Sequence, residues 1–347
     1  MRIAIVGAGI AGLSCAVRLQ DAGHDVTLFD KGRGAGGRMS TRRVETSAGD
    51  AAFDHGAQYL TARDPAFVEA IDEWRVAGVV ARWPAAGDDA WVGTPGMNAI
   101  VKHLADHADV HWQHRVTAIR SDDSGWHVDL SVDDAPQTGG SSKTGTASTD
   151  VSTTTPVTTA SFDAVVIAVP AEQAAPLLAD HDPAMAAQAE ACHSSPNWTA
   201  MLGFAERLAI PDDVIRHAGI IGWAARNTAK PGRSGPEAWV VQATPEWSTT
   251  HLEDTADSVV DRLLAALADY VEGPMPEPIV RTGHRWRYAR ATPAASATPA
   301  AGTSADDHGA LWNAEARLGV AGDWLLAPRI ESAWLSGRML ADRILAG

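Results

Sequence analysis

Gly7-Ala8-Gly9-Ile10-Ala11-Gly12 is the stretch that decides the fold. It follows a short apolar run, Ile3 to Val6, and opens a helix-like segment, Ile10 to Gln20. In such a strand–turn–helix the first glycine permits a tight turn, the second lets the backbone approach a pyrophosphate, and the third lets the helix pack against the strand. The helix start offers free N–H groups and the positive end of its dipole to phosphate. We therefore predict that a dinucleotide binds at Gly7, Gly9, Ile10, Ala11 and Gly12.

A second strand-like run, Asp25 to Phe29, is followed by an acidic residue. Asp30 falls 23 residues after Gly7, where a carboxylate can accept hydrogen bonds from a ribose 2′-hydroxyl. A glycine-rich basic loop follows, with four predicted cofactor ligands: Lys31, Gly36, Gly37 and Arg38. Guanidinium groups pair bidentately with phosphate, so Arg38 is the expected pyrophosphate ligand. NAD-binding domains do not usually need this second loop, and its presence favours FAD.

The C-terminal segment supplies a third piece of the predicted cofactor site. Leu318 to Asp323 is predicted to be a short strand ending in Gly-Asp, from which Asp323 can hold ribityl or pyrophosphate oxygens. The N-terminus of the helix that follows can face the N1–C2=O edge of the flavin, where the helix dipole stabilises negative charge. The predicted cofactor ligands at this helix start are Arg329, Ile330, Glu331 and Ala333.

Seven segments together carry a resemblance to a known family. They are Gly7–Gly12, Gly32–Arg43, Phe53–Tyr59, Trp91–Met97, Val165–Ala171, His284–Arg290 and Gly319–Gly337. On these segments the chain resembles the renalase-like branch of the FAD-dependent amine oxidase superfamily, from end to end apart from two insertions. The resemblance implies that the strand holding Val116 contacts the FAD adenine. No cysteine lies near the C-terminal flavin segment, so FAD is expected to bind non-covalently.

The composition is that of an acidic globular chain. Its 347 residues, 45% of them hydrophobic, can form two domains with a large core. Cys15 and Cys192 are its cysteines, which gives no basis for a disulfide framework or a cysteine metal cluster. The formal charge of −15 argues against nucleic acid as a partner. Because glycines break the N-terminal apolar run and no stretch reaches about 20 apolar residues, we expect no signal peptide, no membrane partner and a cytoplasmic location.

The order of elements predicts an α/β fold, with a Rossmann-like FAD-binding domain and an interleaved α+β substrate domain containing an antiparallel sheet. The predicted FAD-binding domain comprises 1–58, 94–172 and 309–347, and the substrate domain comprises 59–93 and 173–308. The Ser/Thr-rich tract 138–161 is predicted to be a disordered insertion, and 291–308 a second polar loop. Periodicity predicts a helix over 64–76 and a hairpin of strands 110–119 and 126–132.

Substrate chemistry is predicted on the flavin face that the FAD domain leaves uncovered. The candidate catalytic residues are Gln58, Tyr59, His284 and Trp286, and Gln58 is also a candidate cofactor ligand. Aromatic walls can hold a planar ring near flavin N5, while Gln58 or Asn197 can orient an amide. Asn197 and Trp223 are weaker candidates. Core packing is the competing explanation for each of the 13 tryptophans, and a structural hydrogen bond is the competing explanation for His284.

The resemblance implies oxidation of 2- or 6-dihydro isomers of NAD(P)H to NAD(P)+, with hydride transfer to flavin N5. Oxygen, giving hydrogen peroxide, or another acceptor then takes the electrons. Such a donor needs no base from the enzyme, because the lone pair of its own ring nitrogen assists release of the hydride. The residues alone indicate a flavin oxidoreductase. Arg285, Arg287 and Arg329 are candidate partners for substrate phosphates, and surface ion pairs are the competing explanation.

Other classes stay open at this point. A flavin amine oxidase acting on a small amine would share nearly every FAD residue, and many such enzymes place a lysine–water pair at N5. Of the four lysines only Lys230, in a Pro-Gly loop, comes into question. A non-catalytic flavin-binding protein is a further alternative. No metal is predicted, because His103 and His107 at i, i+4 have no third ligand in the sequence. The preferred substrate isomer, the electron acceptor and the oligomeric state are not indicated.

Overall fold

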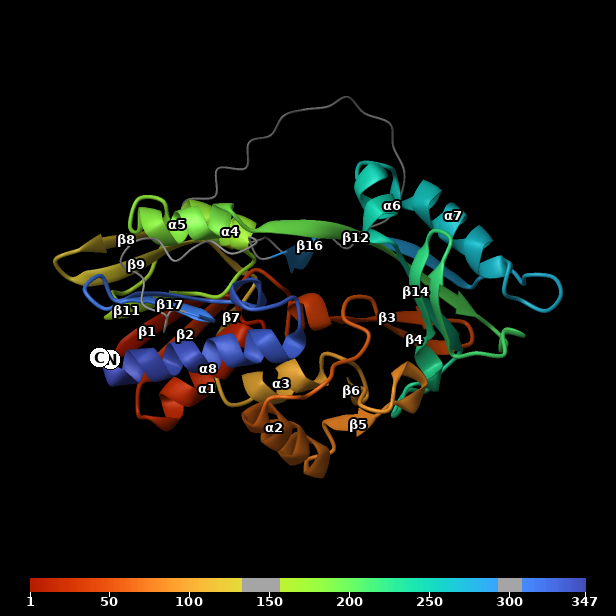
Figure 1. The fold of residues 1–347 in the computed structure, drawn as a ribbon, viewed down its shortest axis with the longest axis horizontal. Coiled ribbons are helices and arrows are strands. Elements are labelled where there is room, and N and C mark those ends of the chain that lie inside the picture. The colour runs from red at the N-terminus through yellow and green to blue at the C-terminus, as the bar shows by residue number, and fades with distance from the viewer. Residues whose placement is uncertain (133–156, 293–307) are drawn as a thin grey trace.

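The computed structural model describes residues 1–132, 157–292 and 308–347 (Figure 1). The predicted insertion 138–161 lies outside the described residues up to position 156. Its next two residues form strand β10 (Val157–Thr158), which pairs with β9 (Gly125–Val132). The predicted loop 291–308 likewise lies outside the described residues from 293 to 307.

A six-stranded sheet forms the first layer, as the N-terminal motif predicts. Its order is β17-β18-β11-β1-β2-β7, parallel except for the edge strand β17. The strands are β1 (Arg2–Val6), β2 (Asp25–Asp30), β7 (Asp109–Trp112), β11 (Ala164–Ile167), β17 (Ala310–Asn313) and β18 (Leu318–Ala321). β1 is buried on both faces: Ile3 and Ile5 belong to one core cluster, and Ala4 and Val6 to another.

Helices lie on the Ile3 and Ile5 side of this sheet and share a core cluster with it. They are α1 (Ile10–Asp21), α2 (Pro65–Val76), α3 (Ala99–Ala105) and α8 (Ile330–Ala346). α8 lies beside α1 (Figure 1), and Gly337 permits this approach, since a Cβ there would lie 2.1 Å from the Ala11 carbonyl oxygen. The Ser14 hydroxyl donates to the Trp334 carbonyl oxygen across the contact at 2.8 Å. Helix α2 confirms the helix predicted over 64–76.

The opposite face carries α4 (Ala171–Leu178), α5 (Pro183–Glu190) and a three-stranded sheet, β10-β9-β8, with β8 spanning His114–Asp122. The predicted strand 110–119 is wrong as a single element. Gln113 has a φ of 63°, so the chain turns there. Residues before it form β7 and pair with β2 in the large sheet, while residues after it form the predicted hairpin with β9.

A five-stranded antiparallel sheet forms the second part of the fold, in the order β13-β14-β15-β12-β16. Its strands are β12 (His193–Phe204), β13 (Val214–Ala218), β14 (Ile221–Arg226), β15 (Glu237–Ala243) and β16 (Val280–Thr292). The long strands β12 and β16 run from the side of α4 and α5 toward α6 (Pro245–Thr250) and α7 (Ala256–Ala268) (Figure 1). Leu202 and its alternate neighbours on β12 face α7, whereas Met201 faces Phe53.

Two small hairpins complete the described strands. β3 (Thr41–Thr46) pairs with β4 (Gly49–Asp54), and β5 (Val80–Arg82) pairs with β6 (Trp91–Gly93). The fold class is therefore as predicted, a Rossmann-like α/β unit with an interleaved antiparallel sheet. The domain boundaries given above stay a prediction. No helix in the described ranges is long and apolar enough to cross a membrane.

Candidate active site

The glycine motif forms a cradle at the start of α1. A Cβ on Gly12 would lie 2.0 Å from the Gly7 carbonyl oxygen, and one on Gly7, whose φ is 102°, would lie 2.5 Å from the Ala168 carbonyl oxygen. A Cβ on Gly9 would meet nothing within 4 Å, so this backbone faces open space. Within the described chain no side chain caps the N-terminus of α1 at Gly9. Open space in front of uncapped N–H groups fits the pyrophosphate of a dinucleotide.

Two predicted ligands from opposite ends of the chain meet beside this cradle. Arg38 donates two hydrogen bonds to the Asp323 carboxylate, at 2.9 and 2.6 Å. Asp323 is 4% exposed, whereas the Arg38 side chain is one-third exposed. Asp30 accepts hydrogen bonds from the backbone N–H groups of Ala8 and Gly32, at 2.8 and 2.6 Å. The structure thus gathers these charged residues around the glycine turn, and their contacts with FAD remain predictions.

The start of α8 is fixed by a buried carboxylate. Glu331 is 7% exposed and accepts hydrogen bonds from the backbone N–H groups of Arg63 and Asp64, at 2.6 and 2.7 Å. This ties α8 to the segment that enters α2. Of the other predicted cofactor ligands, Lys31 donates to the Gln173 side chain at 2.8 Å, and Val116 packs against the α4–α5 core.

The turn after β4, residues 54–59, is held by its own hydrogen bonds. The Gln58 amide nitrogen donates to the carbonyl oxygens of Asp54 and Gly56, at 2.5 and 3.0 Å. A Cβ on Gly56 would lie 2.0 Å from the Arg38 carbonyl oxygen, so the turn packs tightly on the basic loop of the cofactor site. Gln58 is 6% exposed. Its position shapes the turn, and contact with substrate or FAD stays a prediction.

A buried ion cluster lies beneath this turn. The Asp54 carboxylate, 0% exposed, accepts from Lys230 Nζ at 3.1 Å and from Arg233 Nη2 at 2.5 Å. Burial by itself raises the pKa of the Asp54 carboxyl, but the two cations and hydrogen bonds from Met97 and Thr41 outweigh it and hold the pKa well below its usual range. Burial lowers the pKa of Lys230 to about 8, although Asp54 opposes that shift.

Lys230 also reaches the candidate catalytic residues. Its Nζ donates to Gln58 Oε1 at 3.2 Å and lies 5.1 Å from the centroid of the Trp83 ring. Sequence reasoning placed this lysine only in a Pro-Gly loop. Its partner Asp54 lies 176 residues away in the chain, and no local pattern signals such a contact.

Aromatic rings line one side of the turn. Tyr59 packs on Trp223, with centroids 5.3 Å apart and a 32° angle between the planes. Trp83 meets Trp223 edge-on at 6.5 Å, and the Arg216 guanidinium carbon lies 4.8 Å from the centroid of the Trp223 ring. The indole N–H groups of Trp83 and Trp223 are buried without a hydrogen-bond partner among the described residues. The structure therefore brings together two predicted residues, Tyr59 and Trp223, and adds Trp83.

The other two aromatic candidates contact His55, at the start of the turn. His284 and Trp286 of β16 pack on His55, with centroid distances of 4.9 and 5.3 Å, and Trp286 Nε1 donates to the His55 carbonyl oxygen at 2.8 Å. Burial, with His284 and Arg42 nearby, lowers the pKa of His55 to about 4. Burial and Arg42 likewise lower the pKa of His284 to about 4. Both rings are neutral at pH 7. His55 lies within Phe53–Tyr59, one of the segments that carry the family resemblance, but no role was predicted for it.

The remaining candidates have structural partners. The Asn197 amide nitrogen donates to the Ala243 carbonyl oxygen at 2.9 Å, and its oxygen accepts from Thr199. Arg285 and Arg287 both pair with Glu253 at 2.8 Å. They alternate with His284 and Trp286 along β16 and so lie on the other face of the sheet. The surface ion-pair explanation therefore fits these two arginines.

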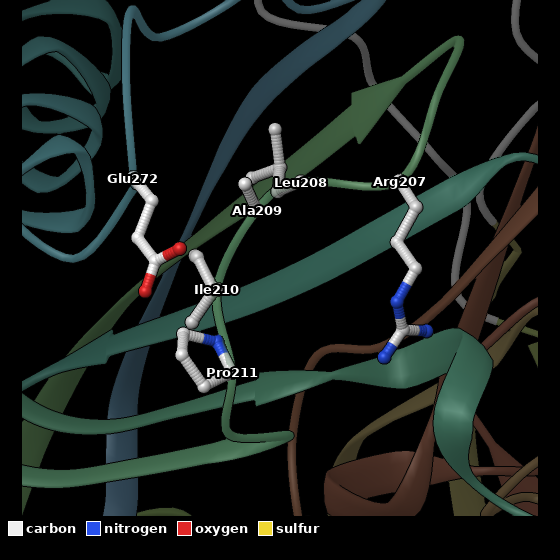
Figure 2. A pocket seen from close by; sticks show the side chains of 6 residues that line it. All are labelled: Arg207, Leu208, Ala209, Ile210, Pro211 and Glu272. Carbon is white, nitrogen blue, oxygen red and sulfur yellow. The ribbon is translucent and has the colours of Figure 1, made fainter.

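A separate hollow lies on the outside of the second sheet. It has a volume of about 380 Å³ and is lined by Arg207, Leu208, Ala209, Ile210, Pro211 and Glu272 (Figure 2). The Glu272 backbone N–H donates to the Ala209 carbonyl oxygen at 2.8 Å and closes one side. No residue predicted for the site lines this hollow.

Fold and site together define a Rossmann-type dinucleotide-binding protein with a second sheet against its cofactor loop. Comparison with known proteins agrees. Residues 5–74 match the model of an NAD(P)-binding Rossmann-like domain, and residues 81–345 match that of the flavin containing amine oxidoreductases. The chain belongs to the flavin-containing amine oxidoreductase family.

Individual relatives show how the likeness is distributed. Renalase of Mus musculus is 24% identical over 332 residues, which cover 86% of this chain and 87% of renalase. This confirms the predicted renalase-like resemblance. A 4,4'-diapophytoene desaturase of Staphylococcus aureus (strain Newman) is 50% identical, but over 40 residues only, 12% of this chain and 8% of the desaturase.

Solved structures confirm the fold. Putrescine oxidase bound to putrescine superposes with a TM-score of 0.67 at 14% identity and full coverage of both chains. Cyclohexylamine oxidase from Brevibacterium oxydans IH-35A also gives 0.67, at 12% identity, covering 99% of this chain and 98% of that chain. FAD is the cofactor of this chain, as predicted, and the open cradle in front of α1 fits its pyrophosphate.

Proposed function

We propose that this flavin oxidoreductase oxidises 2- or 6-dihydro isomers of NAD(P)H to NAD(P)+. The observation that carries the proposal is the state of Lys230, the lysine beside the candidate site. The Lys230 side chain is 0% exposed, and its ammonium group is bound to Asp54 and Gln58. It is therefore not free to form the lysine–water pair that would act as a base at flavin N5. A dihydronicotinamide needs no such base, because its ring nitrogen drives hydride release.

The residues of the turn have defined parts in this proposal. Tyr59 and Trp223 form a wall on which a flat nicotinamide ring can stack. Gln58, held by Lys230, keeps the 54–59 turn in one conformation against the cofactor loop. When bound, FAD supplies the hydride acceptor at N5 and the path of electrons to oxygen or another acceptor. The absence of any transmembrane helix among the described residues is compatible with the cytoplasmic location that we also propose.

A small amine is the second candidate substrate. The Trp83 and Trp223 rings lie near the cations Lys230 and Arg216, and aromatic faces of this kind support the binding of an ammonium group. The amine proposal requires a base, and Lys230 would have to leave Asp54 to provide it.

Steady-state turnover separates the two candidates. Purified FAD-loaded protein is supplied with 2-dihydro-NAD, 6-dihydro-NAD, NADH, putrescine and cyclohexylamine, and oxygen uptake and product are measured. We expect NAD+ from a dihydro isomer, with stoichiometric hydrogen peroxide where oxygen is the acceptor. An aldehyde or ketone formed from an amine, with no turnover of either isomer, would contradict the proposal.

A further inference from the structure

Arg42, His55 and His284 gather at the His55 end of the turn, and Arg33, in the exposed loop before β3, is close enough to lower the pKa of Arg42. We call these four residues the basic cluster. Arg42 on β3 is the cross-strand partner of Phe53, and cross-strand partners have side chains on the same face. That face packs on the second sheet, because Phe53 contacts Met201 and Val280. His284 lies on the same face of β16 as Val280, 4.9 Å from His55.

Electrostatic effects agree with this placement. Arg42 lowers the pKa of both His55 and His284, and Arg33 in turn adds to the effect of burial in lowering the pKa of Arg42. Interactions of this kind require charges that are close in space. The nearby Asp54 carboxylate acts in the opposite sense on His55, but it is already neutralised by two buried cations.

The basic cluster has no counter-charge of its own. Although the chain carries a net charge of −15, neither Arg33 nor Arg42 forms an ion pair with any described residue. His55 is 5% exposed, and its Nδ1 is buried without a well-formed hydrogen bond among the described residues, although the Phe53 backbone is close enough to raise the pKa of the ring. Burying polar groups without partners costs free energy, which an anionic ligand would recover. Arg285 and Arg287, by contrast, are already neutralised by Glu253.

We propose that the basic cluster binds the phosphate groups of the dinucleotide substrate. The inference rests on the proposed function, and it assigns the substrate's charged part to the His55 end of the 54–59 turn and its nicotinamide ring to the Tyr59 end. A guanidinium pairs bidentately with phosphate, and imidazole N–H groups add neutral donors. A part-buried cationic site is needed because the molecule as a whole repels an anionic substrate.

Calorimetric titration of the FAD-loaded protein with inorganic pyrophosphate tests the site directly. The variants are Arg42→Gln and Arg33→Gln, the second in an exposed loop where folding is not at risk. Arg43→Gln is the matched control, since Arg43 follows Arg42 on β3 with its side chain on the opposite face. We expect pyrophosphate binding to weaken about tenfold in each cluster variant and to stay at the wild-type value in the control.

Kinetics with the dihydro isomer then connect the site to substrate. The cluster variants should raise KM far more than they lower kcat, with the dissociation constant of FAD unchanged. Wild-type pyrophosphate binding in Arg42→Gln, or an equal loss in Arg43→Gln, would overturn the proposal. Loss of FAD affinity instead of pyrophosphate affinity would also overturn it, because the cluster would then hold the cofactor. If Arg42-dependent pyrophosphate binding is found but no isomer is oxidised, the proposed function fails while the phosphate site stands.

Discussion

Replacing Asp54 with Asn removes the single negative charge between two buried cations. Lys230 and Arg233 have side chains 0% and 1% exposed, so solvent cannot screen them. Asn keeps an oxygen that can accept from Met97 and Thr41, and the change therefore isolates the charge. Breaking a buried ion pair costs about 3–5 kcal/mol. In the variant Lys230 can lose its proton instead of staying charged without a partner. Because deprotonating a lysine of ordinary pKa at pH 7 takes about 5 kcal/mol, this value is an upper limit on the stability lost through Lys230.

The assay is guanidinium chloride unfolding of the FAD-loaded protein, followed by tryptophan fluorescence. Arg18→Gln is the control, because Arg18 and Asp342 form an ion pair at 2.9 Å with side chains 39% and 55% exposed. Such a pair contributes at most about 1 kcal/mol. We expect Asp54→Asn to lower the free energy of unfolding by about 3–5 kcal/mol. A loss no larger than that of the control would refute the buried ion cluster.

Three further predictions follow from the site. Gly9→Ala should fold normally yet bind FAD at least about tenfold more weakly, because its methyl group enters the phosphate space, whereas Gly12→Ala should fail to fold, because its Cβ meets the Gly7 carbonyl; circular dichroism and FAD titration compare them. The pKa of His284 is about 4 in the folded protein, below its value in the unfolded chain. The contribution of the neutral ring to the free energy of unfolding is therefore complete above about pH 6.5 and is lost as pH falls toward 4. Replacing it with Phe should make unfolding free energy less dependent on pH by about 1 kcal/mol per unit in that window, and an unchanged slope would exclude the assigned shift. Glu331→Gln weakens two buried hydrogen bonds and should cost about 2 kcal/mol in the same unfolding assay, and an unaltered midpoint would contradict this.

The elements that local sequence specifies were predicted well. β1, α1 and β2 lie within one or two residues of the expected positions, because glycine geometry and short apolar runs act over a few residues. The prediction of one strand over 110–119 was wrong at Gln113, where the chain turns. The turn accompanies the pairing of β7 with β2, and a glutamine in the sequence does not indicate a turn. Local patterns report backbone preference, and sheet pairing overrides it.

The candidate site was only partly accessible to the same reasoning. Tyr59 and Trp223 meet as a pair, and His284 and Trp286 meet on β16, but the second pair packs on His55 and not on Tyr59. The contacts that organise them join distant segments: Lys230 with Asp54, and Arg38 with Asp323. A lysine in a Pro-Gly loop carries no sign of a partner 176 residues away, so its burial emerges only from the fold.

The proposed substrate is tested most directly by anaerobic rapid mixing of the FAD-loaded protein with each donor in turn. Loss of the oxidised flavin absorbance band reports hydride transfer without any contribution from the acceptor. The account predicts fast loss with 2- or 6-dihydro-NAD, slow loss with NADH, and none with putrescine or cyclohexylamine. Fast loss with an amine and none with either dihydro isomer would contradict it and would return Lys230 to the role of a base.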